Sequence, residues 1–130
     1  MSVTRKIYAT HNGKTFVRRT PRNYTHAVVS APGPSAITNA EIMVRTWERR
    51  LAEHDAGTPW GDRSREQLAA YLDEAQTFLA QTRDAYAAGR PTFVTWHQRA
   101  DLASKEAAKR STRGYYSAVA IVDVRQGLRQ

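Results

Sequence analysis

Alternating apolar and polar residues near the start of the chain predict a β-hairpin. The runs KIYATH and KTFVRR flank Asn12-Gly13, a pair favoured in two-residue type I′ turns because both positions need a positive φ. A two-residue turn also sets the register of the two strands, so Ile7, Ala9 and Phe16 share one face. The opposite face then carries Lys6, Tyr8, Val17 and Arg19.

The remaining hydrophobic pattern alternates between the strand period and the helix period. Turn-forming residues at 20–23 and 31–34 separate the strands from each other and from the first helix. Apolar residues later recur at spacings of three and four, which is the helical period. Beyond the hairpin we predict a third antiparallel strand over 24–29, helices over 38–53 and 65–88, a strand over 92–96, a helix over 97–110 and a strand over 115–124.

Local capping signals set the expected ends of the two long helices. Thr38 and Glu41 have the spacing of a capping box, so the first helix should begin there. Ser64 and Gln67 repeat this spacing at the start of the second helix, and Gly89 is the expected left-handed residue at its end. Each of these signals lies within a few residues of the helix end that it predicts.

The expected fold is a single α+β domain over residues 1–130. It has a mixed five-stranded sheet in the order β-β-β-α-α-β-α-β, with the helices packed on one face. The strand over 115–124 is apolar on both sides, which is typical of a central strand. The long helix should lie across the sheet, although its stripe also allows a homodimer through a coiled coil. The predicted core residues are Trp47, Leu51, Leu68, Leu72, Phe78, Leu79, Val119 and Ile121.

Composition places the chain among ordinary globular proteins. Hydrophobic residues make up 41% and charged residues 25%, and 130 residues suffice for a hydrophobic core. Because there is no cysteine, a disulfide framework, a thiolate nucleophile and a cysteine zinc site are excluded. The first residues lack the apolar centre of a signal peptide, and no apolar run is long enough for a membrane span. We therefore expect a protein of the cytoplasm without membrane contact.

The net charge of +8 is distributed unevenly along the chain. Residues 1–34 hold six basic residues and no acid, whereas residues 35–89 hold six arginines against nine acids. Residues 90–130 again carry a basic excess, with eight basic residues against three acids. If the two ends meet in the fold, the molecule is polarised, and such a field favours a polyanion or an acidic protein surface.

The sequence offers little support for catalysis. Its four histidines, His11, His26, His54 and His97, form no metal-binding pair and have no carboxylate at ligand-like spacing. The nucleophile and phosphate-loop motifs of common enzymes are also missing. Asp101 stands one helical turn after His97, but an acid near a helix N-terminus commonly stabilises the helix dipole. We therefore expect no enzymatic activity, no metal and no cofactor.

The basic residues at both ends form the main candidate site. Arginine binds phosphates through its planar fork, and tyrosine can stack on a base. Charged residues on an edge strand also prevent aggregation, but that role explains only part of an acid-free segment. We therefore expect contact with DNA or RNA at low sequence specificity. The predicted nucleic-acid-binding residues are Lys6, Arg18, Arg19, Arg22, Tyr24, His26, Arg99, Lys109, Arg110 and Arg113.

A second interpretation remains open, in which the same charges meet an acidic surface of another protein. Exposed aromatic residues such as Trp60 or Trp96 would then anchor the partner. The protein would act as an interaction module that binds and inhibits or redirects a host protein or a defence complex.

Two segments carry a resemblance to a known group of proteins. RRTPRNYTHAVV near the start and WHQRADLASKEA with YYSAVAIVDV near the end resemble small accessory proteins of actinobacterial phages and plasmids. The shared patterns are RT-x-R-x-YTHAVV and W-x-x-R-x-DLA, and the two long helices do not contribute to them. The resemblance implies an accessory protein of a mobile element in the cytoplasm of a bacterial host, and it transfers no catalytic residue.

Overall fold

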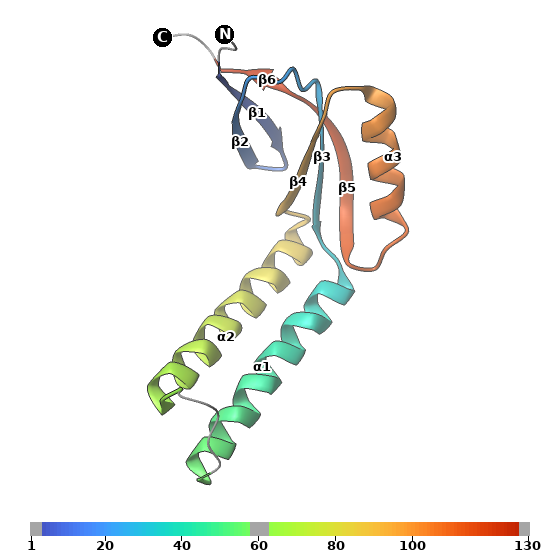
Figure 1. The fold of residues 1–130 in the computed structure, drawn as a ribbon. Coiled ribbons are helices and arrows are strands. Elements are labelled where there is room, and N and C mark those ends of the chain that lie inside the picture. The colour runs from blue at the N-terminus through green and yellow to red at the C-terminus, as the bar shows by residue number, and fades with distance from the viewer. Residues whose placement is uncertain (1–3, 58–62, 128–130) are drawn as a thin grey trace.

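The computed structural model describes residues 4–57 and 63–127 and has an α+β fold. The described part of the chain forms three helices and six strands (Figure 1). In chain order they are β1 (Arg5–His11), β2 (Lys14–Thr20), β3 (His26–Pro32), α1 (Pro34–Asp55), α2 (Arg65–Ala88), β4 (Phe93–His97), α3 (Ala100–Ser111), β5 (Tyr116–Asp123) and β6 (Arg125–Gln126).

The strands form two sheets of three strands each. In one sheet the order is β2-β1-β6, and in the other it is β4-β3-β5, with every pairing antiparallel. The chain passes from β5 directly into β6, so its last strands belong to different sheets. The α+β class is therefore confirmed, but the single mixed sheet of five strands is wrong.

The composition of β3 explains this arrangement. The strand reads HAVVSAP, and all of its residues after His26 are buried. A strand that is apolar on both faces needs a neighbour on each edge and cover on each side. β2 could not supply this cover, because most of its residues are exposed and several are charged. β3 therefore pairs with β4 and β5 rather than continuing the meander from β2.

The strand over 115–124, predicted as central, is an edge strand. β5 pairs only with β3 among the described strands, and different elements contact its two apolar sides. One side meets α3, and the other meets β1. The contacts are partial, because no residue of β5 is fully buried. An edge strand can therefore carry the hydrophobic pattern of a central one when other elements contact both of its sides.

α3 and the β1–β2 hairpin lie on opposite sides of the β4-β3-β5 sheet (Figure 1). Arg110 of α3 contacts the side chain of Ser30, which identifies the α3 side of β3. Because neighbouring side chains alternate, Val29 points to the other side. There the buried residues of β1, Ile7 and Ala9, complete the core.

α1 and α2 pack side by side as a helical hairpin that extends away from the strands (Figure 1). The expected position of the long helix across a sheet is therefore wrong, because its apolar stripe faces α1. α1 also begins earlier than the capping box at Thr38 predicts. Its N-cap is Gly33, followed by Pro34, a residue favoured in the first turn. A side chain at position 33 would collide with the backbone oxygen of Gly114, so only glycine fits.

Two local predictions are confirmed residue by residue. Asn12 and Gly13 both have positive φ, and the hairpin register pairs His11 with Lys14. Ser64 and Gln67 form the complete capping box of α2, and Gly89 closes this helix in the left-handed conformation.

The predicted core is correct only in part. Leu68 and Leu79 are buried between the helices, whereas Phe78 and Ile121 are exposed. The other four predicted core residues, Trp47, Leu51, Leu72 and Val119, are half-buried. A hairpin of two helices buries only the stripe between them, so large residues beside that stripe remain partly in solvent.

Candidate nucleic-acid interface

The β2-β1-β6 sheet has one buried face and one face open to solvent. Directly paired residues of neighbouring strands point to the same face. Lys6 pairs with Arg19, and Tyr8 pairs with Val17 on one side and with Arg125 on the other. The residues between them, such as Ile7, point into the core. We call the open side the outer sheet face and define it as Lys6, Tyr8, Thr10, Thr15, Val17, Arg19 and Arg125.

The outer sheet face carries cations without any acid. Lys6, Arg19 and Arg125 are exposed, and none of them takes part in an ion pair within the described residues. Lys6 of β1 is the direct cross-strand partner of Arg19 on β2, and like charges in such a pair destabilise a sheet. The remaining positions hold a half-buried tyrosine, a valine that is 55% exposed and two threonines joined by a hydrogen bond of 2.9 Å. An anion on this face would relieve the repulsion.

Arg18 and Arg22 lie at the rim of this sheet. Arg18 shares the inward side with Ile7, but at the open end of the hairpin its guanidinium turns over the ring of Tyr24, 5.0 Å from the ring centre. Arg22 is exposed in the following turn, where its backbone N–H donates to the Thr20 hydroxyl. Both arginines therefore lie beside the outer sheet face rather than on it, and Tyr24 already has a cation over its ring.

The basic residues of α3 belong to a different surface. Lys109 and Arg113 are exposed on the far side of the β4-β3-β5 sheet, and Arg99 is paired with Asp101 at 3.1 Å. One flat ligand cannot touch these residues and the outer sheet face together, because a sheet lies between them. The single merged surface expected if α3 packed beside the hairpin is therefore not formed.

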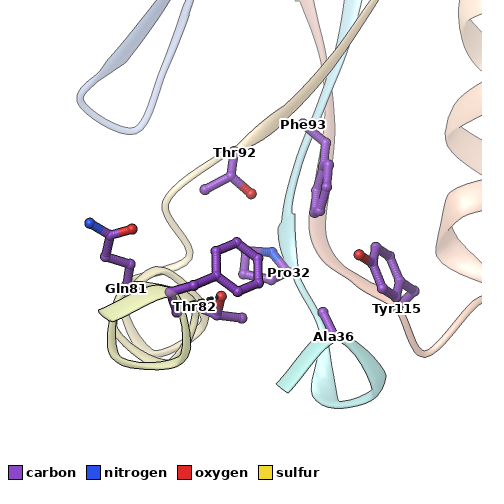
Figure 2. A pocket seen from close by; sticks show the side chains of 8 residues that line it. Pro32, Ala36, Gln81, Thr82, Thr92, Phe93 and Tyr115 are labelled. Atoms are coloured by element: carbon purple, nitrogen blue, oxygen red, sulfur yellow. Dashed lines mark hydrogen bonds between the residues drawn. The ribbon is translucent and has the colours of Figure 1, made fainter. Parts of the chain in front are cut away.

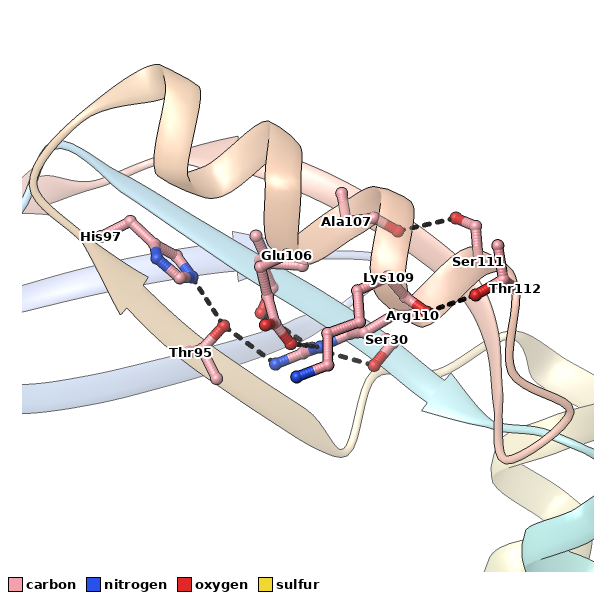
Figure 3. A network of polar contacts seen from close by, with 10 residues as sticks. Ser30, Thr95, His97, Glu106, Ala107, Lys109, Arg110, Ser111 and Thr112 are labelled. Carbon is pink, nitrogen blue, oxygen red and sulfur yellow. Dashed lines mark hydrogen bonds and ion pairs between the residues drawn. The ribbon is translucent and has the colours of Figure 1, made fainter.

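Arg110 lies inside the protein, and only 3% of it is exposed. Its guanidinium donates to Glu106 at 2.8 Å, to the backbone oxygen of Val28 at 3.1 Å, to Ser30 at 3.0 Å and to Thr95 at 2.9 Å (Figure 3). The ring of Tyr116 covers it at 5.4 Å. These contacts anchor α3 to β3 and β4 and leave the side chain out of reach of an external phosphate.

His97 joins the same network at its solvent edge (Figure 3). Burial lowers the pKa of His97; Arg110 and His26 lower it further, and Glu106 opposes them. The ring Nε2 lies 2.8 Å from the Thr95 hydroxyl, which also accepts from Arg110. Because the Thr95 hydroxyl oxygen accepts from Arg110, its own hydrogen remains available to donate to Nε2 of a neutral imidazole.

His26 is half-buried on the α3 side, so it does not belong to the outer sheet face. Its strand partner is His97, and its Nδ1 contacts the hydroxyl of Thr25 at 2.8 Å. The described residues include no group of three histidines or acids that could hold a metal ion.

Two apolar hollows lie along the helical hairpin and its base. The first, about 240 Å³, lies between α2, the start of α1 and the aromatic residues Phe93 and Tyr115 (Figure 2). The second, about 300 Å³, lies between Met43 and Trp47 of α1 and Tyr71 of α2. Phe78 borders both hollows and is 57% exposed, and Met43 is 51% exposed.

Trp96, one of the two predicted tryptophan anchors, does not line these hollows. Trp96 is half-buried and pairs with Ala27, so it points away from α3. Trp60 lies outside the described residues.

Sequence reasoning missed Arg125 as a site residue. The predicted last strand ended at Val124, and nothing in the following residues indicates that they pair with β1. The only available signal was a cation directly after an apolar strand. The strand that pairs with Arg125, β1, lies more than a hundred residues earlier in the sequence. No local pattern could therefore show which face of the sheet Arg125 joins.

Comparison of the chain with protein-family models, curated proteins and solved structures finds no match. Among the described helices, none combines the length and the apolar character needed to cross a membrane.

Proposed function

We propose that the protein binds nucleic acid through the outer sheet face, by phosphate contacts and with low sequence specificity. The observation that carries this proposal is the direct cross-strand pairing of Lys6 with Arg19 on a face without acids. A third cation, Arg125, lies on the neighbouring strand. Each cation gains from a phosphate, and the sheet loses a repulsive pair when the phosphate binds.

The proposed role is that of an accessory protein of a mobile element in a bacterial cell. It rests on the resemblance of these segments to such proteins and on the basic excess of residues 1–34 and 90–130, within which they lie. Low specificity follows from the kind of contact. Cations that bind phosphates fix the position of a nucleic-acid strand but carry no sequence information.

A salt titration tests this function. Binding of a fluorescein-labelled oligonucleotide is followed by anisotropy at increasing salt concentration. If Z phosphates are contacted, the logarithm of the binding constant falls linearly with the logarithm of salt, with a slope of about −0.7Z to −0.9Z. Three cations of the outer sheet face predict a slope of about −2 to −3, and the rim arginines would steepen it. Absence of binding even at low salt would exclude the proposal.

The helical hairpin favours a second candidate, a protein-interaction module that binds through apolar residues instead of the basic residues and tryptophans expected from the sequence. Met43 and Phe78 expose about half of their surface beside two apolar hollows, and exposed apolar patches of this kind commonly mark interaction sites. The partner would be a host protein that places apolar side chains in these hollows.

The two candidates use different parts of the molecule, so one pair of variants separates them. Phe78→Asp would abolish the binding of a protein partner and leave nucleic-acid binding intact, whereas Arg19→Glu would have the opposite pattern.

A further inference from the structure

We infer that the nucleic acid is single-stranded and that one of its bases stacks on Tyr8. This inference rests on the proposed function and adds to it the class of nucleic acid and the residue that contacts a base. Tyr8 lies on β1, the middle strand of the β2-β1-β6 sheet, and its side chain points to the outer sheet face. It is the one aromatic residue on that face.

The cations surround Tyr8 at short range. Arg125 is its direct partner on β6, and Lys6 is two residues away on β1, a separation of about 7 Å along a strand. Arg19 lies opposite Lys6 on β2. A base on the tyrosine would therefore have its two flanking phosphates within reach of three cationic side chains. This combination of a stacking ring and surrounding cations is common in proteins that bind single strands.

Gly127 leaves room for the ring. Its N–H donates to the backbone oxygen of Lys6 at 3.0 Å, which holds Gly127 beside β1. A Cβ at position 127 would lie 2.8 Å from Cε2 of Tyr8 and 3.2 Å from its hydroxyl oxygen. The glycine backbone therefore supports one edge of the ring, and no side chain at this position covers it. The ring is half-buried, so it is held in place while part of it stays in solvent.

A double helix fits this surface less well. Its bases are stacked on one another and present only their edges in the grooves, so a ring in the middle of a flat sheet cannot reach their faces. The rim does not provide a second free ring, because Arg18 occupies Tyr24. A duplex would gain only the phosphate contacts.

The first test changes the ligand and keeps the protein. Anisotropy is measured with a labelled oligothymidylate, with a strand of equal length whose central nucleotides are abasic, and with a duplex of equal length. Loss of one stacked base predicts a binding constant about 5- to 150-fold lower for the abasic strand. The duplex should also bind more weakly than the single strand, although it offers more phosphates.

The second test changes the protein. Tyr8→Leu should weaken binding to the single strand by the same factor and leave duplex binding unchanged, whereas Tyr8→Phe keeps the ring and should retain nearly full affinity. Gly127→Ala should weaken single-strand binding because it displaces the ring. Each variant is first checked by thermal unfolding, and the abasic comparison decides the question if Tyr8→Leu does not fold.

The outcomes distinguish this inference from the proposed function. Equal binding of thymidylate, abasic strand and duplex, all with a steep salt dependence, would overturn base stacking and keep phosphate binding. No salt-dependent binding to any of the three would remove both. A single-strand preference that Tyr8→Leu leaves unchanged in a folded protein would overturn the assignment of the base to Tyr8.

Discussion

Nη1 of Arg110 donates to Oγ of Ser30 at 3.0 Å, and this bond joins the last turn of α3 to the central strand β3. The same guanidinium forms an ion pair with Glu106 and bonds to Thr95, so one buried cation connects α3 with two strands. A buried charge of this kind is stable only while all of its partners are present.

Arg110→Met should lower the free energy of unfolding by about 2–4 kcal/mol, because it leaves Glu106 and the Ser30 hydroxyl without their partner. The neighbouring Lys109→Met removes the same charge from an exposed position and should change stability by less than about 0.5 kcal/mol. Urea unfolding of both variants measures the difference. Equal midpoints would contradict an anchoring role for Arg110.

The stability of the protein should fall below pH 6.5 because of His97. The pKa of this imidazole is lowered in the folded protein from its ordinary value of 6.5, chiefly by burial. The unfolded chain therefore takes up a proton before the folded one does, and stability decreases as the pH falls from 6.5 to the lowered pKa. Above 6.5 the ring is neutral in both states and contributes nothing to the slope.

The measurement isolates His97 as a difference between the wild type and a variant without this imidazole. The urea midpoint is followed against pH for the wild type and for His97→Gln, and the variant should show the shallower loss on the acid side. Identical slopes would mean that the folded protein protonates His97 as easily as the unfolded chain does.

The hairpin tip should be held by Asn12. Its side-chain amide donates to the backbone oxygens of Ala88 at 3.0 Å and Gly89 at 2.8 Å, which joins the turn to the end of α2. Asn12→Gly keeps a residue that accepts positive φ but loses both bonds, and should cost about 1 kcal/mol. Asn12→Asp also suits the turn but places a carboxylate against two carbonyl oxygens, so it should cost more. The prediction fails if the aspartate variant unfolds at the wild-type urea concentration.

Truncation of two adjacent residues of α2 should destabilise the protein to very different extents. Leu79 is buried against α1, and Leu79→Ala should cost about 2–4 kcal/mol. Phe78 is largely exposed, so Phe78→Ala should cost less than about 1 kcal/mol. Thermal or urea unfolding distinguishes them. A large loss for Phe78→Ala would show that its hollows are closed in solution.

Arg19→Glu should separate binding from stability. It replaces the repulsion with Lys6 by an attraction, so the free energy of unfolding should rise by a few tenths of a kcal/mol to about 1 kcal/mol. The same change should weaken oligonucleotide binding and reduce the magnitude of the salt slope by about one or more. Anisotropy and urea unfolding are measured on the same preparations.

Arg45→Glu is the matched control, because it makes the same change of charge on the helical hairpin, away from the β2-β1-β6 sheet. It should retain nearly all of the affinity. If Arg19→Glu and Arg45→Glu weaken binding equally, net charge attracts the ligand and the outer sheet face is not a site.

Features that depend on neighbouring residues follow directly from the sequence. Asn12-Gly13 specified the turn and the register of β1 and β2, because positive φ is a property of those two residues. Ser64 and Gly89 specified both ends of α2 in the same way. The register also places Lys6, Tyr8 and Arg19 on the side opposite Ile7 and Ala9, but only the fold shows which of the two sides is buried.

Which elements meet depends on the whole fold. Periodicity shows that a segment has an apolar side but does not show what covers it, so the pattern of α2 fits a sheet as well as it fits α1. The pattern also cannot show that Arg110 is buried, because a polar residue becomes an interior one only when Ser30, Thr95 and Glu106 converge on it from distant positions. Arg125 reached the outer sheet face through pairing between the two ends of the chain, and such pairing depends on the shape of the whole protein.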